Sequence, residues 1–180
     1  MLKAVSKLAG GIAIAANAAG TLVVLALVVV VNFDVVARGV FNKPFLGAVE
    51  VVQFSMVLIV FLQLPDVVRV NRLTASDGFQ LVIGKRYPRV TRALRLAINT
   101  VAALFMAAIA YVMFPEFIEM WHTQDFFGVQ GIFTAPWWPI KLVIFLSAAL
   151  CALLFAIKLL LPSDDVQLLR IPPESDEAAE

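Results

Sequence analysis

The sequence predicts an all-α polytopic membrane protein with four transmembrane helices and both termini cytoplasmic. Of the 180 residues, 62% are hydrophobic and only 15% are charged, whereas a soluble domain is about half apolar and about a quarter charged. The apolar residues form four long runs separated by polar segments. Lysine and arginine are concentrated in the segments expected on one side of the membrane, which fixes the orientation of the helices.

The first apolar run covers residues 8–33 and contains no charged residue. At a helical rise of 1.5 Å per residue it spans about 39 Å, more than the roughly 30 Å hydrocarbon core of a bilayer. A cleaved signal peptide is the rival interpretation, but the run continues well past the small residues at 15–19 that could form a cleavage site. We therefore expect a transmembrane helix at about 8–40.

The other three apolar runs predict helices at about 45–68, 94–115 and 137–161. Each reaches the length of about 20 residues that a transmembrane helix needs. The whole of residues 1–162 is thus expected to form a single membrane domain. Residues 163–180 are acidic and rich in proline, a composition that predicts a disordered cytoplasmic tail.

The segment between the third and fourth helices carries an aromatic signal. Trp137 and Trp138 open the fourth helix, and paired tryptophans are typical of the membrane–water interface, so we expect them to anchor this helix. Residues 126–133 are apolar but too short to span a membrane. We expect this stretch to lie in the interface or against a partner.

The orientation follows from the basic residues. Residues 66–95 contain seven lysines and arginines against two aspartates, whereas no basic residue lies between Arg95 and Lys141. Because short cytoplasmic segments carry the excess of basic residues, we place residues 66–95 on the cytoplasmic side of the membrane. The residues expected to set this orientation are Arg86, Arg89 and Arg92.

Polar residues mark the connection between the first two helices. Asp34 and Arg38 are four residues apart and so share a helix face. They are either a solvated ion pair or a pair that holds the hairpin or contacts a partner subunit. Glu50 lies in the first turn of the second helix, where the helix dipole favours a carboxylate, and Gln53 shares its face. Such residues usually face protein rather than lipid, so we expect partner contacts here.

The sequence offers little for catalysis. The only histidine, His122, lies in the external segment, which excludes a bis-histidine haem and a Ser-His-Asp triad in the membrane core. Glu116, Glu119 and His122 recur every three residues and could align a metal site, although a solvated helix end is the ordinary alternative. The single cysteine, Cys151, excludes an internal disulfide. We expect no cofactor, no metal, no catalytic residue, no nucleic-acid partner and no enzymatic activity.

Several segments together resemble a known family. These are the Asn-Phe-Asp-Val-Val-Ala-Arg stretch at 32–38, the turn at 41–48, Glu50, the Val-Phe-Leu at 60–62 and the Tyr-Pro-Arg at 87–89. With the length and the four predicted helices, they resemble the small membrane subunit of tripartite ATP-independent periplasmic (TRAP) transporters, the DctQ-like family. The resemblance covers about residues 8–161. At 70–77 the chain lacks the Gly-Gly-His-Ile pattern of many members, so the resemblance does not identify the solute.

The resemblance implies an accessory scaffold subunit of a sodium-driven importer in the inner membrane of a bacterium. Its partners would be a large DctM-like membrane subunit, which carries the transport path, and a periplasmic solute-binding protein that delivers an organic acid. The absence of an internal repeat and of charges at helix centres agrees with a chain that is not the path by itself. The alternatives are a membrane-anchor or assembly subunit of another inner-membrane complex, and a small enzyme that uses Glu116, Glu119 and His122.

Overall fold

Four long helices make up most of the computed structural model, which describes residues 2–43, 47–70, 88–129 and 133–160. They are α1 (Leu2–Phe41), α2 (Ala48–Arg69), α4 (Pro88–Thr123) and α5 (Trp138–Leu160). Each is long and apolar enough to cross a membrane. This confirms the predicted all-α fold with four transmembrane helices, while the cytoplasmic placement of both termini stays a prediction.

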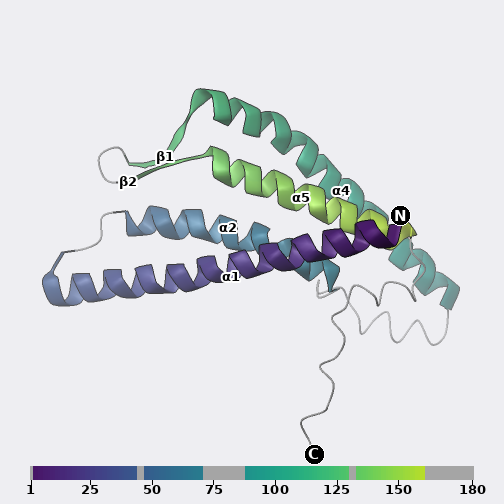
Figure 1. Cartoon of the computed structure of the whole chain (residues 1–180), viewed down its shortest axis with the longest axis horizontal. Helices are drawn as coiled ribbons and strands as arrows, with labels where there is room; N and C mark the ends of the chain where they lie inside the picture. Colours follow the sequence, from purple (N-terminus) through teal and green to yellow (C-terminus); the bar gives the residue numbers. More distant parts are fainter. Residues whose placement is uncertain (1, 44–46, 71–87, 130–132, 161–180) are drawn as a thin grey trace, which may run out of the picture.

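Two of the helices are longer than a bilayer requires. Helix α1 has 40 residues and α4 has 36, which correspond to about 60 Å and about 54 Å at helical rise. The helix that was expected to end at Pro115 continues to Thr123. Proline is tolerated inside transmembrane helices when its surroundings satisfy the freed carbonyl, and α4 is curved (Figure 1).

The helices are arranged as two hairpins. Helix α1 packs along α2, and α4 packs along α5, while contacts of α5 with α2 and α1 join the two pairs. Figure 1 shows that the hairpins approach each other at the end where α1 begins and α5 finishes, and diverge toward the opposite end. The buried core consists of Ala9, Ala13, Val68, Cys151, Leu154, Phe155 and Ile157. These residues come from the first turns of α1 and the last turns of α2 and α5, so the core lies at the end where the hairpins meet.

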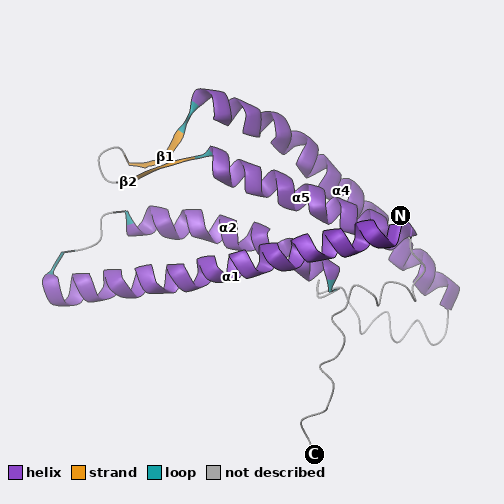
Figure 2. Cartoon of the chain, in the orientation of Figure 1, coloured by secondary structure: helices purple, strands orange, loops and turns teal. Residues whose placement is uncertain are grey.

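A short β-hairpin connects α4 to α5, which the sequence did not predict (Figure 2). Strand β1 (Phe126–Val129) pairs antiparallel with β2 (Phe133–Pro136). The backbone N–H of Trp137 donates to the carbonyl of Asp125 over 3.0 Å and closes the base of the hairpin. Gly128 has φ 113°, a conformation that glycine adopts without strain. The location of this hairpin relative to the membrane or a partner stays a prediction.

Large apolar side chains cover the outer surfaces of the two hairpins. On α4, Val101, Leu104 and Phe105 are each more than 60% exposed, and on α1 Leu22 and Val29 are exposed to the same degree. Soluble proteins seldom expose contiguous apolar surfaces of this extent. Lipid chains or other membrane-spanning helices must therefore cover these faces.

Candidate assembly interface

The predicted pair of charges at the end of α1 is formed. Arg38 Nη2 lies 2.8 Å from Asp34 Oδ2. The Asp34 side chain is only 13% exposed, whereas that of Arg38 is 62% exposed. Because both residues belong to one helix, the pair does not itself join two helices, and an i,i+4 ion pair stabilises its own helix by only about 0.2–0.5 kcal/mol. Its role in partner contact stays a prediction, and the exposed guanidinium is the part available for one.

Glu50 and Gln53 lie in the first two turns of α2. The helix begins after Gly47, whose φ of 99° is in the left-handed region. Glu50 is half-buried and Gln53 is exposed. Within the described residues, no hydrogen bond or ion pair to either side chain is formed. The structure therefore does not join Glu50 to Arg38, and both polar groups on α2 remain available to another chain.

The two predicted anchor tryptophans pack against rings of their own chain. The ring of Trp138 lies 5.0 Å from that of Trp121 in an edge-on arrangement, and Trp137 lies 4.9 Å from Phe127. Edge-to-face pairs of this kind add about 0.5–1.5 kcal/mol to the burial of the rings. Trp138 therefore fastens α5 to α4, and Trp137 fastens the β-hairpin to α5. Their contact with the membrane interface stays a prediction.

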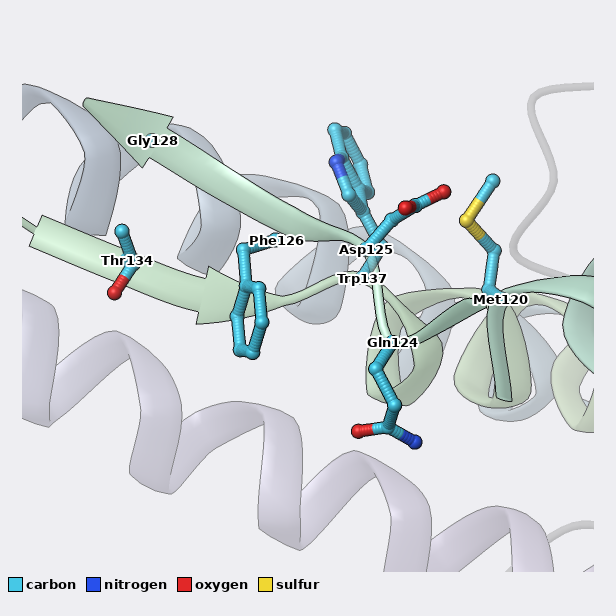
Figure 3. A pocket seen from close by; sticks show the side chains of 7 residues that line it. All are labelled: Met120, Gln124, Asp125, Phe126, Gly128, Thr134 and Trp137. Atoms are coloured by element: carbon cyan, nitrogen blue, oxygen red, sulfur yellow. The ribbon is translucent and has the colours of Figure 1, made fainter. Parts of the chain in front are cut away.

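An open pocket of about 520 Å³ lies where α4, the β-hairpin and α5 meet (Figure 3). It is lined by Met120, Gln124, Asp125, Phe126, Gly128, Thr134 and Trp137. In Figure 3 the Asp125 carboxylate and the Trp137 indole point to one side, while the Gln124 amide and the Phe126 ring point to the other. Because the side chains do not converge on one point, the pocket offers no defined set of ligands.

The acidic residues considered for a metal site are not assembled into one. Among the described residues no group of three His, Cys, Asp or Glu side chains could hold a metal ion. Glu116 instead accepts a bond from Lys141, with Nζ 3.1 Å from Oε2, which links α4 to α5. The hypothesis of a site made by Glu116, Glu119 and His122 therefore has no geometric support.

The arginines expected to set the orientation lie at the edge of what the structure describes. Arg86 is outside the described residues, and Arg89 and Arg92 contribute backbone to the first turns of α4. Their role stays a prediction.

A polar network at the converging end of the helices was missed by the sequence analysis. Asn17 Nδ2 donates to Asp66 Oδ2 over 2.9 Å and joins α1 to α2. Arg69 Nε donates to the other carboxylate oxygen of Asp66 over 2.7 Å, and the Arg69 side chain is only 4% exposed. Lys158 Nζ donates to the carbonyl of Val68 and so joins α5 to the last turn of α2. Three helices are thus held together by polar bonds toward the end where the two hairpins meet.

The residues that α1 and α2 contribute to this network stand out in the sequence as polar groups in or beside apolar runs. Asn17 is a polar residue inside the first apolar run, and Asp66 and Arg69 are three residues apart just after the second. Polar residues inside transmembrane segments usually face protein. What the sequence lacks is the alignment of the two helices, because Asn17 and Asp66 are 49 positions apart.

The same two helices approach closely at Gly20. A Cβ atom on this residue would lie 2.8 Å from Gln63 Cγ and 3.2 Å from Leu62 Cβ. Small residues allow such close packing of transmembrane helices. Small residues are frequent between Ala9 and Gly20, and Gly20 is where α1 and α2 approach most tightly among the glycines of α1 whose surroundings are described.

The bond from Lys158 leads to a testable expectation. Lys158→Met keeps the length of the side chain but removes the ammonium donor to the Val68 carbonyl, so we expect the free energy of unfolding to fall by about 2 kcal/mol. The measurement is an SDS titration of the subunit in mild detergent, followed by tryptophan fluorescence. The control is Lys141→Met, which removes the more exposed bond to Glu116 and should cost less than about 1 kcal/mol. Equal midpoints for Lys158→Met and the unchanged chain would contradict the expectation.

Four membrane-spanning helices, a polar network that joins three of them and broad exposed apolar faces define a small multi-pass membrane subunit. The family described as tripartite ATP-independent periplasmic transporters, DctQ component, matches residues 27–163. The chain belongs to this family, which confirms the resemblance seen in the sequence. The comparisons with curated proteins and with solved structures gave no match.

Proposed function

We propose that this chain is the accessory scaffold subunit of a sodium-driven TRAP transporter in the bacterial inner membrane. With a large DctM-like membrane subunit and a periplasmic solute-binding protein, it imports an organic acid. The observation that carries the proposal is the match to the DctQ component of tripartite transporters over residues 27–163. Such a component acts with other chains, and it supplies neither catalysis nor a cofactor site.

The use of the polar residues supports a scaffold rather than a transport path. Polar side chains of α1, α2 and α5 make bonds that join helices, namely Asn17 to Asp66 and Lys158 to the Val68 carbonyl. Residues of a transport path instead line a water-filled cavity or relay ions. A chain whose intramembrane polar groups fasten its own helices is suited to remain fixed while a partner moves.

The orientation in this proposal places the converging end of the helices at the cytoplasmic surface. Asp66, Arg69 and Lys158 lie at that end, next to the basic segment that begins after α2. The positive-inside rule assigns basic segments to the cytoplasm. The two termini are then cytoplasmic, and the β-hairpin and the α1–α2 connection face the periplasm.

The experiment that tests the proposal is a pull-down of the tagged chain from its native membrane in mild detergent, with mass spectrometry of the co-purified chains. We expect a large multi-helix subunit in near-equal amount. Recovery of a different inner-membrane complex would favour the alternative of an anchor or assembly subunit. Recovery of the tagged chain alone would overturn the proposal.

The outer charge pair can be tested in the same assay. Asp34→Ala and Arg38→Ala are expected to lower the yield of the complex several-fold while leaving insertion of the subunit unchanged, because the pair adds little to the stability of α1 itself. Western blots of membrane fractions measure insertion, and the ratio of the two subunits after pull-down measures assembly. The control is Asp125→Ala, which removes an exposed carboxylate near the β-hairpin. Normal complex yield from both variants would refute this role.

A further inference from the structure

One stripe on the outer half of α2 combines exposed apolar residues with an exposed amide. Val49, Met56 and Val60 are 63%, 58% and 59% exposed, and Gln53 between them is also exposed. Their spacing of four, three and four residues places all four on one face of the helix. Other residues of α2, including Ser55 and Val68, are the ones buried against the rest of the chain. The stripe therefore points away from the subunit.

Gln53 is the feature that distinguishes this stripe. It lies five residues into α2, about 7.5 Å along the axis at helical rise. The exposed side chains of Thr21 and Asn32 on α1 find hydrogen-bond acceptors within their own helix, since each donates to the backbone carbonyl four residues earlier. Gln53 makes no hydrogen bond to any described residue. An amide without a hydrogen bond is costly in an apolar medium, because it gives up its bonds to water and gains none in return.

The exposed face of α4 has the opposite character. Val101, Phe105 and Val112 lie on one face of that helix and are 66%, 62% and 54% exposed. They are bulky and wholly apolar, so lipid chains can cover them without leaving any polar group unpaired. The two hairpins thus offer surfaces of similar exposure but different chemistry.

We propose that Val49, Gln53, Met56 and Val60 form the face of α2 that contacts a transmembrane helix of the large membrane subunit, and that this helix presents a hydrogen-bond donor to Gln53. The amide of Gln53 can donate and accept, whereas the carboxylate of Glu50, one turn nearer the start of α2, can only accept when ionised. A donor on the partner helix would suit both groups, so a donor is the preferred chemistry. Interhelical hydrogen bonds to Gln side chains are a recurrent means of helix association in membranes. This assignment rests on the proposed function and adds the contact surface to it.

The test is photocrosslinking of the full transporter in its native membrane, with p-benzoylphenylalanine introduced at Met56 or, as the matched control, at Val112. The two side chains are 58% and 54% exposed. The ring contact of 5.4 Å between Phe114 and Phe145 aligns α4 with α5, and the bond from α5 to the last turn of α2 aligns those helices. Together these contacts put positions 56 and 112 at similar depth. We expect the large subunit to crosslink to position 56 and not to position 112.

A second experiment tests the contribution of the Gln53 side-chain amide separately from that of its apolar neighbours. Gln53→Leu keeps similar bulk but removes the hydrogen-bonding group, so we expect the yield of co-purified large subunit to fall about threefold to tenfold, with the SDS unfolding midpoint of the isolated subunit unchanged. Gln53→Asn, which retains an amide, should lose less. If the unchanged chain recovers the large subunit but position 112 crosslinks as well as or better than 56, or if Gln53→Leu has no effect, the assignment of this face is wrong. If the unchanged chain recovers no large subunit, the proposed function itself is wrong.

Discussion

Replacing Asp66 by alanine is expected to lower the free energy of unfolding of the subunit by about 3 kcal/mol. The substitution removes the acceptor for the Asn17 amide, which joins α1 to α2, and the carboxylate that faces the buried Arg69 side chain. Removing one partner of a buried ion pair costs about 3–5 kcal/mol, because the remaining charge loses its compensation. Arg69 makes further contacts, so we place the effect at the lower end. Unfolding by SDS in mild detergent, followed by tryptophan fluorescence, measures it.

A second variant separates the hydrogen bond from the charge. Asp66→Asn retains an oxygen that can accept from Asn17 while it neutralises the partner of Arg69. It should therefore fall between the unchanged chain and Asp66→Ala. The surface control is Asp125→Ala, for which no change is expected because the residue is exposed. An Asp66→Ala midpoint equal to that of the control would mean that the network adds nothing to the packing of the helices.

Gly20→Leu is expected to separate α1 from α2 and to cost about 3 kcal/mol, and Gly20→Ala about 1–2 kcal/mol. The first atom of either new side chain would meet Gln63 Cγ at 2.8 Å and Leu62 Cβ at 3.2 Å, both close to the backbone of α2. Overpacking of a tight contact costs about 1–3 kcal/mol, and a leucine adds three more carbons in the same place. The same SDS titration gives the values.

The chain supplies its own controls for this substitution. A Cβ atom on Gly11 or Gly39 would meet nothing within 4 Å. Gly11→Ala and Gly39→Ala should therefore leave the isolated subunit as stable as before or slightly more stable, because alanine is the better helix former. If all three alanine variants behaved alike, the close approach at Gly20 would not contribute to stability.

The sequence predicted the membrane class and the number of helices because these depend on composition and run length alone. The start of α1 and the two ends of α4 differ most from the expected bounds, since α1 begins at Leu2 rather than at about 8 and α4 covers Pro88–Thr123 rather than about 94–115. Pro115 looked like a terminus because proline disfavours a helix interior. In a membrane protein, however, neighbouring groups can satisfy the freed carbonyl, and α4 runs on to Thr123.

Contacts between residues far apart in the sequence could not be predicted from the residue pattern of a single chain. The pair Asp34–Arg38 could be predicted, because an i,i+4 spacing is local. The bond between Asn17 and Asp66 and the bond from Lys158 to Val68 depend on how helices slide along one another, and many registers satisfy the same apolar pattern. The β-hairpin was missed for a related reason, since its strands have only four residues each and little alternation of polar and apolar side chains.

The bond that joins α5 to α2 also bears on how the chain is made. Lys158 follows Val68 by 90 positions, and ribosomes add about 5–20 residues per second. For roughly 5–18 s of synthesis, therefore, the α1–α2 hairpin exists without the donor that later fastens the last turn of α2. During that interval only contacts within the first hairpin, such as the Asn17–Asp66 bond, can hold its helices in register. Helix α5 is thus the last of these four helices to emerge from the ribosome, and its arrival completes the bonds that join them.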